Sequence, residues 1–429
     1  MSSLTVTLIL FSLLLLLLFL NVPLVVSIGL PTALIMLGSG MKVATLAQRT
    51  YASVDSFTLM AIPFFMLAGK LMEVGGMSKR IVRLADCLVG WMAGGLAHVI
   101  VVASAFFGAL SGSAAATTAA IGSTLIPEMK KRGYPADFVA GIQAVAGALG
   151  VIIPPSITMI MYGVCSSTSI GKLFMAGIVP GIVLAFFLMV TIAYQAKKRK
   201  ISQMNTFTFK ELGTAFLDAI PALLVPTIIL GGIYGGIFTP TEAGAVAATY
   251  GFLAGAFWYK EINLQNIGNI MGGAIVNTVL VMIVVGASGA FSWLLTSAGV
   301  SSLLGKAISA IAGNKYIFLL VANLIFIFIG MFIESVAGIL IVTPILLPIA
   351  TSLGVDPVHF GIIMVVNLAL GLTTPPVGEN QYIAAAIAEI PFEEEVKASI
   401  PFLIAGFAAL AVITYVEPLS LWLPGILGM

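Results

Sequence analysis

The chain has 429 residues, of which 60% are hydrophobic and only 8% charged, and its formal net charge at pH 7 is +2. A soluble globular domain carries about 25% charged residues, so this composition cannot supply a water-facing surface and most of the surface must face lipid. A net charge this small also gives no support for nucleic-acid binding.

Apolar runs that can cross a lipid bilayer, or half of it, recur along the whole chain and predict an all-α polytopic membrane protein. In the first half the sequence predicts helices at 4–20, 23–42, 55–74, 93–110, 114–128, 137–152, 155–165 and 172–195. In the second half it predicts helices at 217–235, 240–258, 267–296, 316–333, 336–352, 358–372, 377–389 and 398–425. The polar interval from Lys197 to Lys210 divides the chain almost in half.

The two halves share a pattern of residues that indicates an internal duplication. A shift of 221 positions aligns Pro127 with Pro348, Gly133 with Gly354, Ala148-Leu149 with Ala369-Leu370, Gly150 with Gly371, and Pro154-Pro155 with Pro375-Pro376. One shared Pro-Pro pair would mean little, but seven identities in one register are unlike a chance match.

Basic residues in short loops mark the cytoplasmic side of a membrane protein. They cluster at 79–83, 130–132 and 197–200. The first two clusters flank the segment 84–129, which is too long for one crossing, so we expect a re-entrant hairpin that enters and returns on the cytoplasmic side. Counting the crossings onward, a second re-entrant hairpin at 316–352, flanked only by Lys306 and Lys315, starts from the opposite side. The sequence therefore predicts two inverted-topology repeats.

Each predicted repeat contains two interruptions of helical backbone at membrane depth. They are the tip Ser111-Gly112-Ser113, the break from Val151 to Ser156, the tip Glu334-Ser335 and the break from Thr373 to Asn380. Unpaired N–H and C=O groups survive at this depth only when they are buried in protein or line a wet cavity. Broken helices in inverted repeats direct helix N-termini toward an anionic substrate and freed carbonyls toward a coupling cation.

Hydroxyl side chains gather at these interruptions. They are Ser111, Ser113, Thr117, Thr118, Ser156, Thr158, Ser335, Thr373 and Thr374. A hydroxyl can ligate a hard cation or donate a hydrogen bond to a carboxylate. The alternative is that each hydroxyl bonds to its own backbone or to a neighbouring helix, as is common in membrane helices.

Two acidic residues at the interruptions are functional candidates, because ionisable groups at membrane depth are costly. Glu334, in the register of Ser113, either holds a cation or caps the next helix. Glu379, beside Asn380, either contacts substrate or faces a cytoplasmic vestibule. By contrast, Glu242 follows Thr239-Pro240 in the pattern of a capping box and is interpreted as structural.

The sequence offers no site for a nucleotide that would energise transport. The segment 299–307 resembles a phosphate-binding loop, but its spacing is one residue too long and Ala307 replaces the Ser or Thr that holds magnesium. We therefore expect an ion gradient to drive transport.

Four strings resemble the large membrane subunit, the DctM-like permease, of tripartite ATP-independent periplasmic (TRAP) transporters. They are SGSAAATTAAIG (111–122), IPPSITMIMYG (153–163), GGIYGGIFTPTEAGAVAATYG (231–251) and GLTTPPVG (371–378), and the resemblance runs from about residue 21 to the C-terminus. It implies a sodium-coupled, elevator-type secondary transporter with an ion-transporter-like fold in the bacterial or archaeal cytoplasmic membrane. The implied substrate is a small organic acid such as a C4-dicarboxylate or sialic acid.

The resemblance also implies partners and ligands. The partners are a small four-helix membrane subunit and a periplasmic substrate-binding protein; because Met1 leads directly into the first predicted helix, we expect no fused small subunit. The resemblance implies sodium ions at Ser111, Gly112, Ser113, Pro154, Pro155, Glu334, Ser335, Thr373, Thr374, Pro375 and Pro376. Substrate contacts are expected at Ser156, Thr158, Thr117, Glu379 and Asn380. Glu379-Asn380-Gln381 departs from the apolar residues common at this point in the family, which leaves the substrate open.

The expected domain organisation follows from the two repeats. It comprises scaffold helices and an arm at 1–83, a transport-domain hairpin and broken helix at 84–170, scaffold helices and a linker at 171–296, a second transport-domain hairpin and broken helix at 297–390, and a C-terminal helix at 391–429. The competing hypotheses are a passive anion channel and a stand-alone carboxylate transporter. An intramembrane enzyme is disfavoured, because the chain lacks a paired catalytic Asp, a zinc cluster or a Ser/His arrangement.

Overall fold

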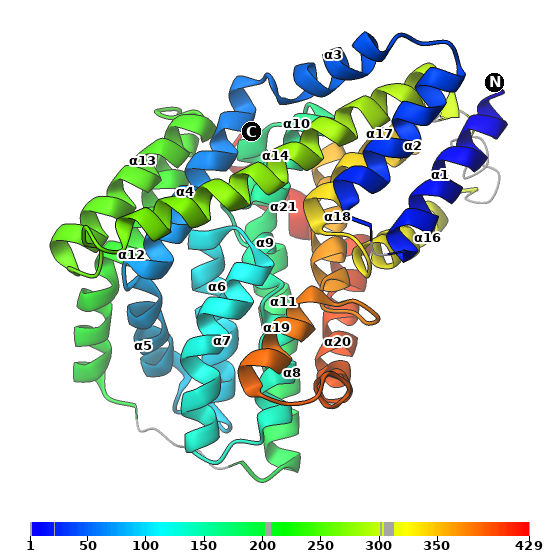
Figure 1. Ribbon diagram of the computed structural model, residues 1–429. Coiled ribbons are helices and arrows are strands. Elements are labelled where there is room, and N and C mark those ends of the chain that lie inside the picture. The colour runs from blue at the N-terminus through cyan, green and yellow to red at the C-terminus, as the bar shows by residue number, and fades with distance from the viewer. Residues whose placement is uncertain (1, 21, 202–206, 301–302, 304–312, 429) are drawn as a thin grey trace.

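A computed structural model describes residues 2–20, 22–201, 207–300, 303 and 313–428, and within these ranges the chain is helical without any strand (Figure 1). Six of the described helices are long and apolar enough to cross a membrane. A seventh span results if the pair Ala136–Ile152 and Ile157–Ser166, bent by 45° at its break, counts as one. These spans confirm the all-helical, polytopic prediction. Lys306 and Ala307 lie outside the described residues, as does most of the segment compared with a phosphate loop.

The helices of the first half follow the predicted order. They are α1 (Ser3–Phe19), α2 (Leu24–Gly38), α3 (Val43–Val54), η1 (Phe57–Met60), α4 (Ala61–Val74), α5 (Met77–Val89), α6 (Gly95–Ser111), α7 (Ala114–Lys131), α8 (Ala136–Ala146), α9 (Leu149–Ile152), α10 (Ile157–Ser166) and α11 (Ile170–Lys198).

The second half repeats several of these elements. Its helices are α12 (Phe209–Tyr234), α13 (Pro240–Leu253), η2 (Ala254–Trp258), α14 (Ile267–Ser297), α16 (Lys315–Gly330), α17 (Ser335–Ser352), α18 (Pro357–Gly371), α19 (Glu379–Ala388), α20 (Phe392–Tyr415) and α21 (Pro418–Ile426). The hairpin α6–α7 corresponds to α16–α17, and the broken helix α8–α10 corresponds to α18–α19.

The structure differs from the predicted elements in two missed helices, in the start of the first hairpin and in one divided helix. The amphipathic helices α3 and α5 were missed, because their polar residues break the apolar runs that the prediction relied on. The first hairpin consequently begins at Gly95 and not at residue 84, after a turn in which Gly94 adopts a φ of 79°. The predicted helix 398–425 is two helices, since α20 ends at Tyr415 and Pro418 starts α21.

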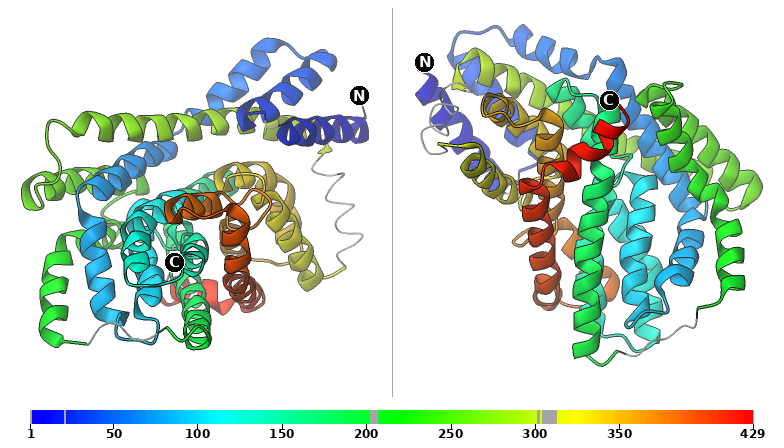
Figure 2. Two further views of the ribbon diagram at one scale, coloured as in Figure 1. Left: turned by 60° about the horizontal axis from the view of Figure 1, so that its bottom comes forward. Right: turned by 180° about the vertical axis from the view of Figure 1, so that it is seen from behind.

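An outer layer of helices lies against an inner bundle. The long helix α14 packs on α2, α3 and α4, and α13 packs on α4 and α12. In the left view of Figure 2, α14 lies as a long bar across the molecule with the N-terminal helices near one end. The inner bundle contains both hairpins and both broken helices, together with α11 and α20, which pack on each other.

The two halves interlock through their broken helices. The half-helix α10 of the first half packs on α17 of the second hairpin, and α19 of the second half packs on α7 of the first hairpin. Each hairpin therefore contacts the broken helix of the other half, and neither half forms its own separate domain.

Glycines let each hairpin cross its own broken helix closely. A Cβ atom at Gly371 of α18 would lie 2.5 Å from the Cα of Gly330 in α16, and one at Gly108 of α6 would lie 2.8 Å from the carbonyl oxygen of Leu149. Backbones approach this closely in membrane proteins only where small residues meet. The close crossing holds each tip beside a break.

Candidate functional site

A cavity of about 430 Å³ lies where the two hairpins, the broken helices and the outer helices α4 and α14 meet; we call it the central cavity. Half of its polar lining residues come from the interruptions that the sequence singled out. Its polar and charged lining residues are Lys70, Glu73, Ser111, Ser113, Thr158, Asn277, Glu334 and Glu379, and Gly112 lies among them.

The first tip, Ser111-Gly112-Ser113, is a tight reversal between α6 and α7. Gly112 has a φ of 62°, a left-handed conformation that favours glycine. Ser113 caps α7 by accepting a hydrogen bond from the Ala116 N–H at 3.4 Å, and the hydroxyls of Ser111 and Thr117 lie 2.9 Å apart. The tip therefore presents hydroxyl and backbone groups without any charge.

The first break, residues 153–156, lies directly against this tip. A Cβ atom at Gly112 would be 3.0 Å from the carbonyl oxygen of Pro155. Ser156 caps α10 by accepting from the Met159 N–H at 3.3 Å. Thr158, in the first turn of α10, is only 1% exposed, lines the cavity and makes no hydrogen bond to any described residue.

The second tip, residues 331–335, carries a charge in place of the hydroxyl of the first. Glu334 caps α17, because its Oε2 accepts a hydrogen bond from the Val336 N–H at 2.9 Å. Its side chain also lines the central cavity. Glu334 therefore caps α17, as one of the two interpretations expected, and it faces the cavity as well. The hydroxyl of Ser335 is buried and has no partner in the described part of the chain.

The second break, residues 372–378, separates α18 from α19. The hydroxyls of Thr373 and Thr374 both donate to the Leu370 carbonyl at 2.7 Å, as the local-bonding alternative expected. Asn380 is buried and donates to the Ala144 carbonyl at 3.4 Å, which ties α19 to α8. Glu379 lines the cavity and makes no hydrogen bond or ion pair to any described residue.

The cavity wall contains only part of the predicted site. Predicted residues that line it are Ser111, Gly112, Ser113, Thr158, Glu334 and Glu379. Predicted residues outside this lining are Thr117, Pro154, Pro155, Ser156, Ser335, Thr373, Thr374, Pro375, Pro376 and Asn380. The residues of the second group lie in or beside the interruptions but do not line the cavity, so they can act on the cavity only through the residues that line it.

Sequence reasoning missed the contribution of the outer helices. Lys70 and Glu73 of α4 line the cavity, and the Lys70 Nζ donates to both carboxylate oxygens of Glu73 at 3.1 and 3.0 Å. Asn277 of α14 lines the same wall. The signal for the first two was present, since a Lys and a Glu within an apolar span are functional candidates.

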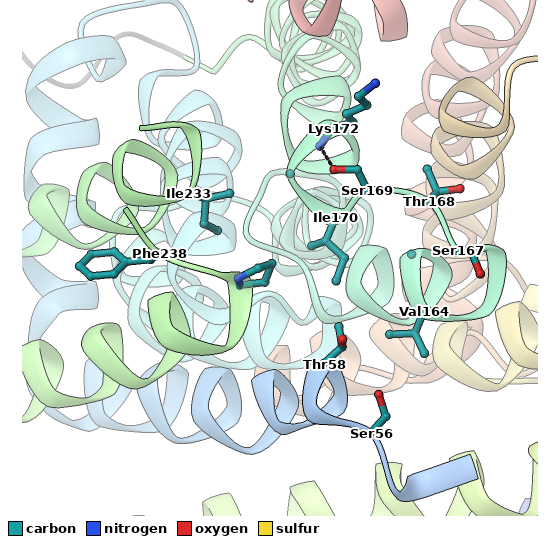
Figure 3. Close-up of a pocket in the computed structure, with 13 residues that line it drawn as sticks. Ser56, Thr58, Val164, Ser167, Thr168, Ser169, Ile170, Lys172, Ile233 and Phe238 are labelled. Carbon is teal, nitrogen blue, oxygen red and sulfur yellow. Dashed lines mark hydrogen bonds between the residues drawn. The ribbon is translucent and has the colours of Figure 1, made fainter. Parts of the chain in front are cut away.

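A second hollow, which we call the outer pocket, lies at the opposite end of α10 (Figure 3). Its volume is about 820 Å³, and its lining includes Ser167, Thr168 and Ser169 from the α10–α11 connection and Lys172 from the first turn of α11. Thr58 contributes from η1, and Phe238 from the α12–α13 connection. The half-helix α10 thus begins at the central cavity and ends at the outer pocket.

The central cavity combines features suited to binding an organic anion. The first-turn N–H groups of α7 and α10 have no partners within their helices, and helix N-termini attract negative charge. Lys70, Thr158 and Asn277 add hydrogen-bond donors on two sides. The backbone and hydroxyl oxygens at the tips are the ligand type that hard cations take.

Comparison with known proteins gives matches over nearly the whole chain. Residues 8–419 match the family described as tripartite ATP-independent periplasmic transporter, DctM component. The chain is 42% identical over 404 residues to the C4-dicarboxylate TRAP transporter large permease protein DctM of Pseudomonas aeruginosa, covering 94% of this chain and 95% of that one. It is 42% identical over 410 residues to the isethionate TRAP transporter permease protein DctMQ of Oleidesulfovibrio alaskensis, covering 94% of this chain and 64% of the relative. The crystal structure of the YdaH transporter of Alcanivorax borkumensis shares the fold, with a TM-score of 0.63 over 88% of this chain and 89% of that chain at 14% identity.

Proposed function

The chain belongs to the tripartite ATP-independent periplasmic transporter family as a DctM component, and on this premise we propose that it imports a small organic acid by coupling uptake to a sodium gradient. Membership makes it a multi-pass membrane permease and not an enzyme. The family does not fix the substrate, because relatives of equal identity are named for a C4-dicarboxylate and for isethionate. Both compounds are small organic anions.

One observation carries the proposal: residues of the two tips and residues that flank the two breaks line a single cavity between the halves. Interrupted helices leave polar backbone groups that are tolerated at membrane depth only in such a place. In secondary transporters, arrangements of this kind direct helix N-termini to an anionic substrate and carbonyls to a cation. The central cavity has both kinds of group.

We assign the sodium ions to two sites, one per half. The first site uses the tip Ser111-Gly112-Ser113 and the carbonyls of Pro154 and Pro155, with Ser156 beside them. The second uses the side chains of Glu334 and Ser335 and the backbone oxygens of Thr373, Thr374 and Pro375-Pro376. The contact between Gly112 and Pro155 supports the first site, and the unpartnered buried hydroxyl of Ser335 supports the second.

We propose that the inner bundle moves as an elevator against the outer helices. In this mechanism 84–170 and 297–390 form the moving domain, the repeats have inverted topology, and the outer helices of 1–83 and 171–296 stay in place. The position of the cavity on the boundary supports it, because α4 and α14 form one wall and the interruptions form the others. Within 171–296, α11 packs mainly on α20, α21 and α18, so α11 would travel with the inner bundle.

The proposed partners are a periplasmic substrate-binding protein and a small four-helix membrane subunit, in a bacterial or archaeal cytoplasmic membrane. Support comes from the relative named DctMQ, since this chain covers only 64% of its length. The remaining length leaves room for a second subunit in the same polypeptide.

The test is uptake into proteoliposomes that contain the permease, its small subunit and its binding protein. We expect an inward sodium gradient to drive accumulation and its dissipation to abolish it, while potassium in place of sodium gives no accumulation. Undiminished uptake without sodium would refute the coupling. A passive anion channel would instead give single-channel currents, and a stand-alone transporter would work equally well without the binding protein.

A further inference from the structure

The charges that line the central cavity are unfavourable for a substrate with two negative ends. The lining contains one cationic side chain, Lys70, and three carboxylates, Glu73, Glu334 and Glu379. Lys70 is already engaged, because its ammonium contacts both oxygens of Glu73. The wall therefore carries an excess of negative charge before any substrate enters.

Sodium at the two proposed sites would offset the charge of the wall as a whole, but neither site includes Glu379. If a sodium ion sits at Glu334, as proposed above, the Glu379 carboxylate still has no neutralising group. Among the described residues it makes no hydrogen bond and no ion pair, although it faces the cavity from the first turn of α19. An unpaired carboxylate acts as an acceptor for donors that a ligand brings, and it repels a like charge.

The same cavity offers a place for one carboxylate. The N-terminal turns of α7 and α10 face it through Ala114, Ala115 and Thr158, and their first N–H groups have no intrahelical partners. The Thr158 hydroxyl is almost fully buried, lines the cavity and has no partner among the described residues. Its free donor beside two helix N-termini fits a single carboxylate.

Given the proposed function, we propose that the substrate carries one carboxylate at the Thr158 end and hydroxyl or ammonium donors at the other, and that Glu379 selects for those donors. A dicarboxylate is disfavoured because its second carboxylate would face Glu379 without compensation. Selection against such a competitor by an unpaired like charge is a common way to build specificity. Glu379 is thus a specificity-determining residue.

The test compares ligands that differ only at the far end. Purified full-length permease in sodium buffer is titrated with succinate, 3-hydroxypropionate and β-alanine, which share a two-carbon spacer, and with the longer pair glucarate and gluconate. Thermal stability of the protein reports binding without needing a gradient or a partner protein. We expect a monocarboxylate to stabilise at a concentration at least roughly tenfold below its matched dicarboxylate, a factor equal to about 1.4 kcal/mol.

The variant Glu379→Gln should shrink this preference to less than about threefold, since it keeps the size of the side chain and removes the charge. Glu389→Gln is the matched control, because Glu389 is exposed and pairs with Lys130 away from the cavity. Equal or tighter binding of the dicarboxylate by the wild type, no stabilisation by any of the five ligands, or an unchanged preference in Glu379→Gln would overturn the inference. Sodium-driven uptake could still hold in each case, so the two proposals fail separately.

Discussion

The two hairpin tips have the same backbone role but different chemistry. The first tip is neutral and its hydroxyls are engaged, that of Ser111 with the Thr117 hydroxyl and that of Ser113 with the Ala116 N–H of α7. The second tip places Glu334 in the register of Ser113 and leaves the Ser335 hydroxyl without a described partner. The two tips therefore share an interruption of the helix but carry different side chains. Under the proposed function, the first half would hold a neutral cation site and the second a charged one.

Glu334→Gln should produce the largest difference between the halves. Because interactions with a charged group are worth about 1.5–3 kcal/mol, we expect the sodium concentration for half-maximal uptake to rise roughly tenfold to a hundredfold. Ser113→Ala removes only a neutral capping hydroxyl and should raise the same quantity by less than about tenfold. Sodium titrations of uptake by the two variants check the order, and a larger effect of Ser113→Ala would reverse the assignment.

Alanine at Gly150 and at Gly371, which share one register in the two halves, should lower stability by similar amounts. At these positions it is the close packing of the backbone that the halves have in common. A Cβ atom at Gly371 would press on the Gly330 backbone, and one at Gly150 would meet the side chain of Thr117. Overpacking of this kind costs about 1–3 kcal/mol, which thermal unfolding of the purified permease can measure. Gly268→Ala is the control, since nothing lies within 4 Å of that position. A loss of stability from only one of the two substitutions would show that the close packing is not common to both halves.

The smallest expected effect is the difference between removing two hydroxyls of the second half, those of Ser335 and Thr373. Thr373 already donates to the Leu370 carbonyl, whereas Ser335 has no described partner. Ser335→Ala should therefore raise the sodium concentration for half-maximal uptake by roughly threefold to tenfold, in line with about 1 kcal/mol for one hydrogen bond. Thr373→Val should change it by less than about twofold. Sodium titrations of uptake by both variants check this difference. Equal increases in the sodium concentration for half-maximal uptake would mean that both hydroxyls act on the cation.

The interruptions were predictable from sequence because Pro-Pro pairs and glycines limit backbone conformation locally. The breaks at Pro154-Pro155 and Pro375-Pro376 accordingly lie within a few residues of their predicted positions. Which hydroxyl bonds locally depends on rotamers and neighbours, so Thr373 could not be distinguished from Ser335. The packing of α10 on α17 joins segments that are far apart in sequence, and no local signal encodes it. Lys70 was not predicted to line the site, because its helix was assigned to the scaffold.

The contact of Gly330 with Gly371 has a mechanical consequence. With no side chain between them, α16 and α18 cannot slide past each other without their main chains colliding. In the proposed elevator movement, a displacement of the second hairpin would carry the adjoining break along, so the distances among the oxygens assigned to the second cation would stay constant. A bound ion would then be transported inside an unchanging coordination shell.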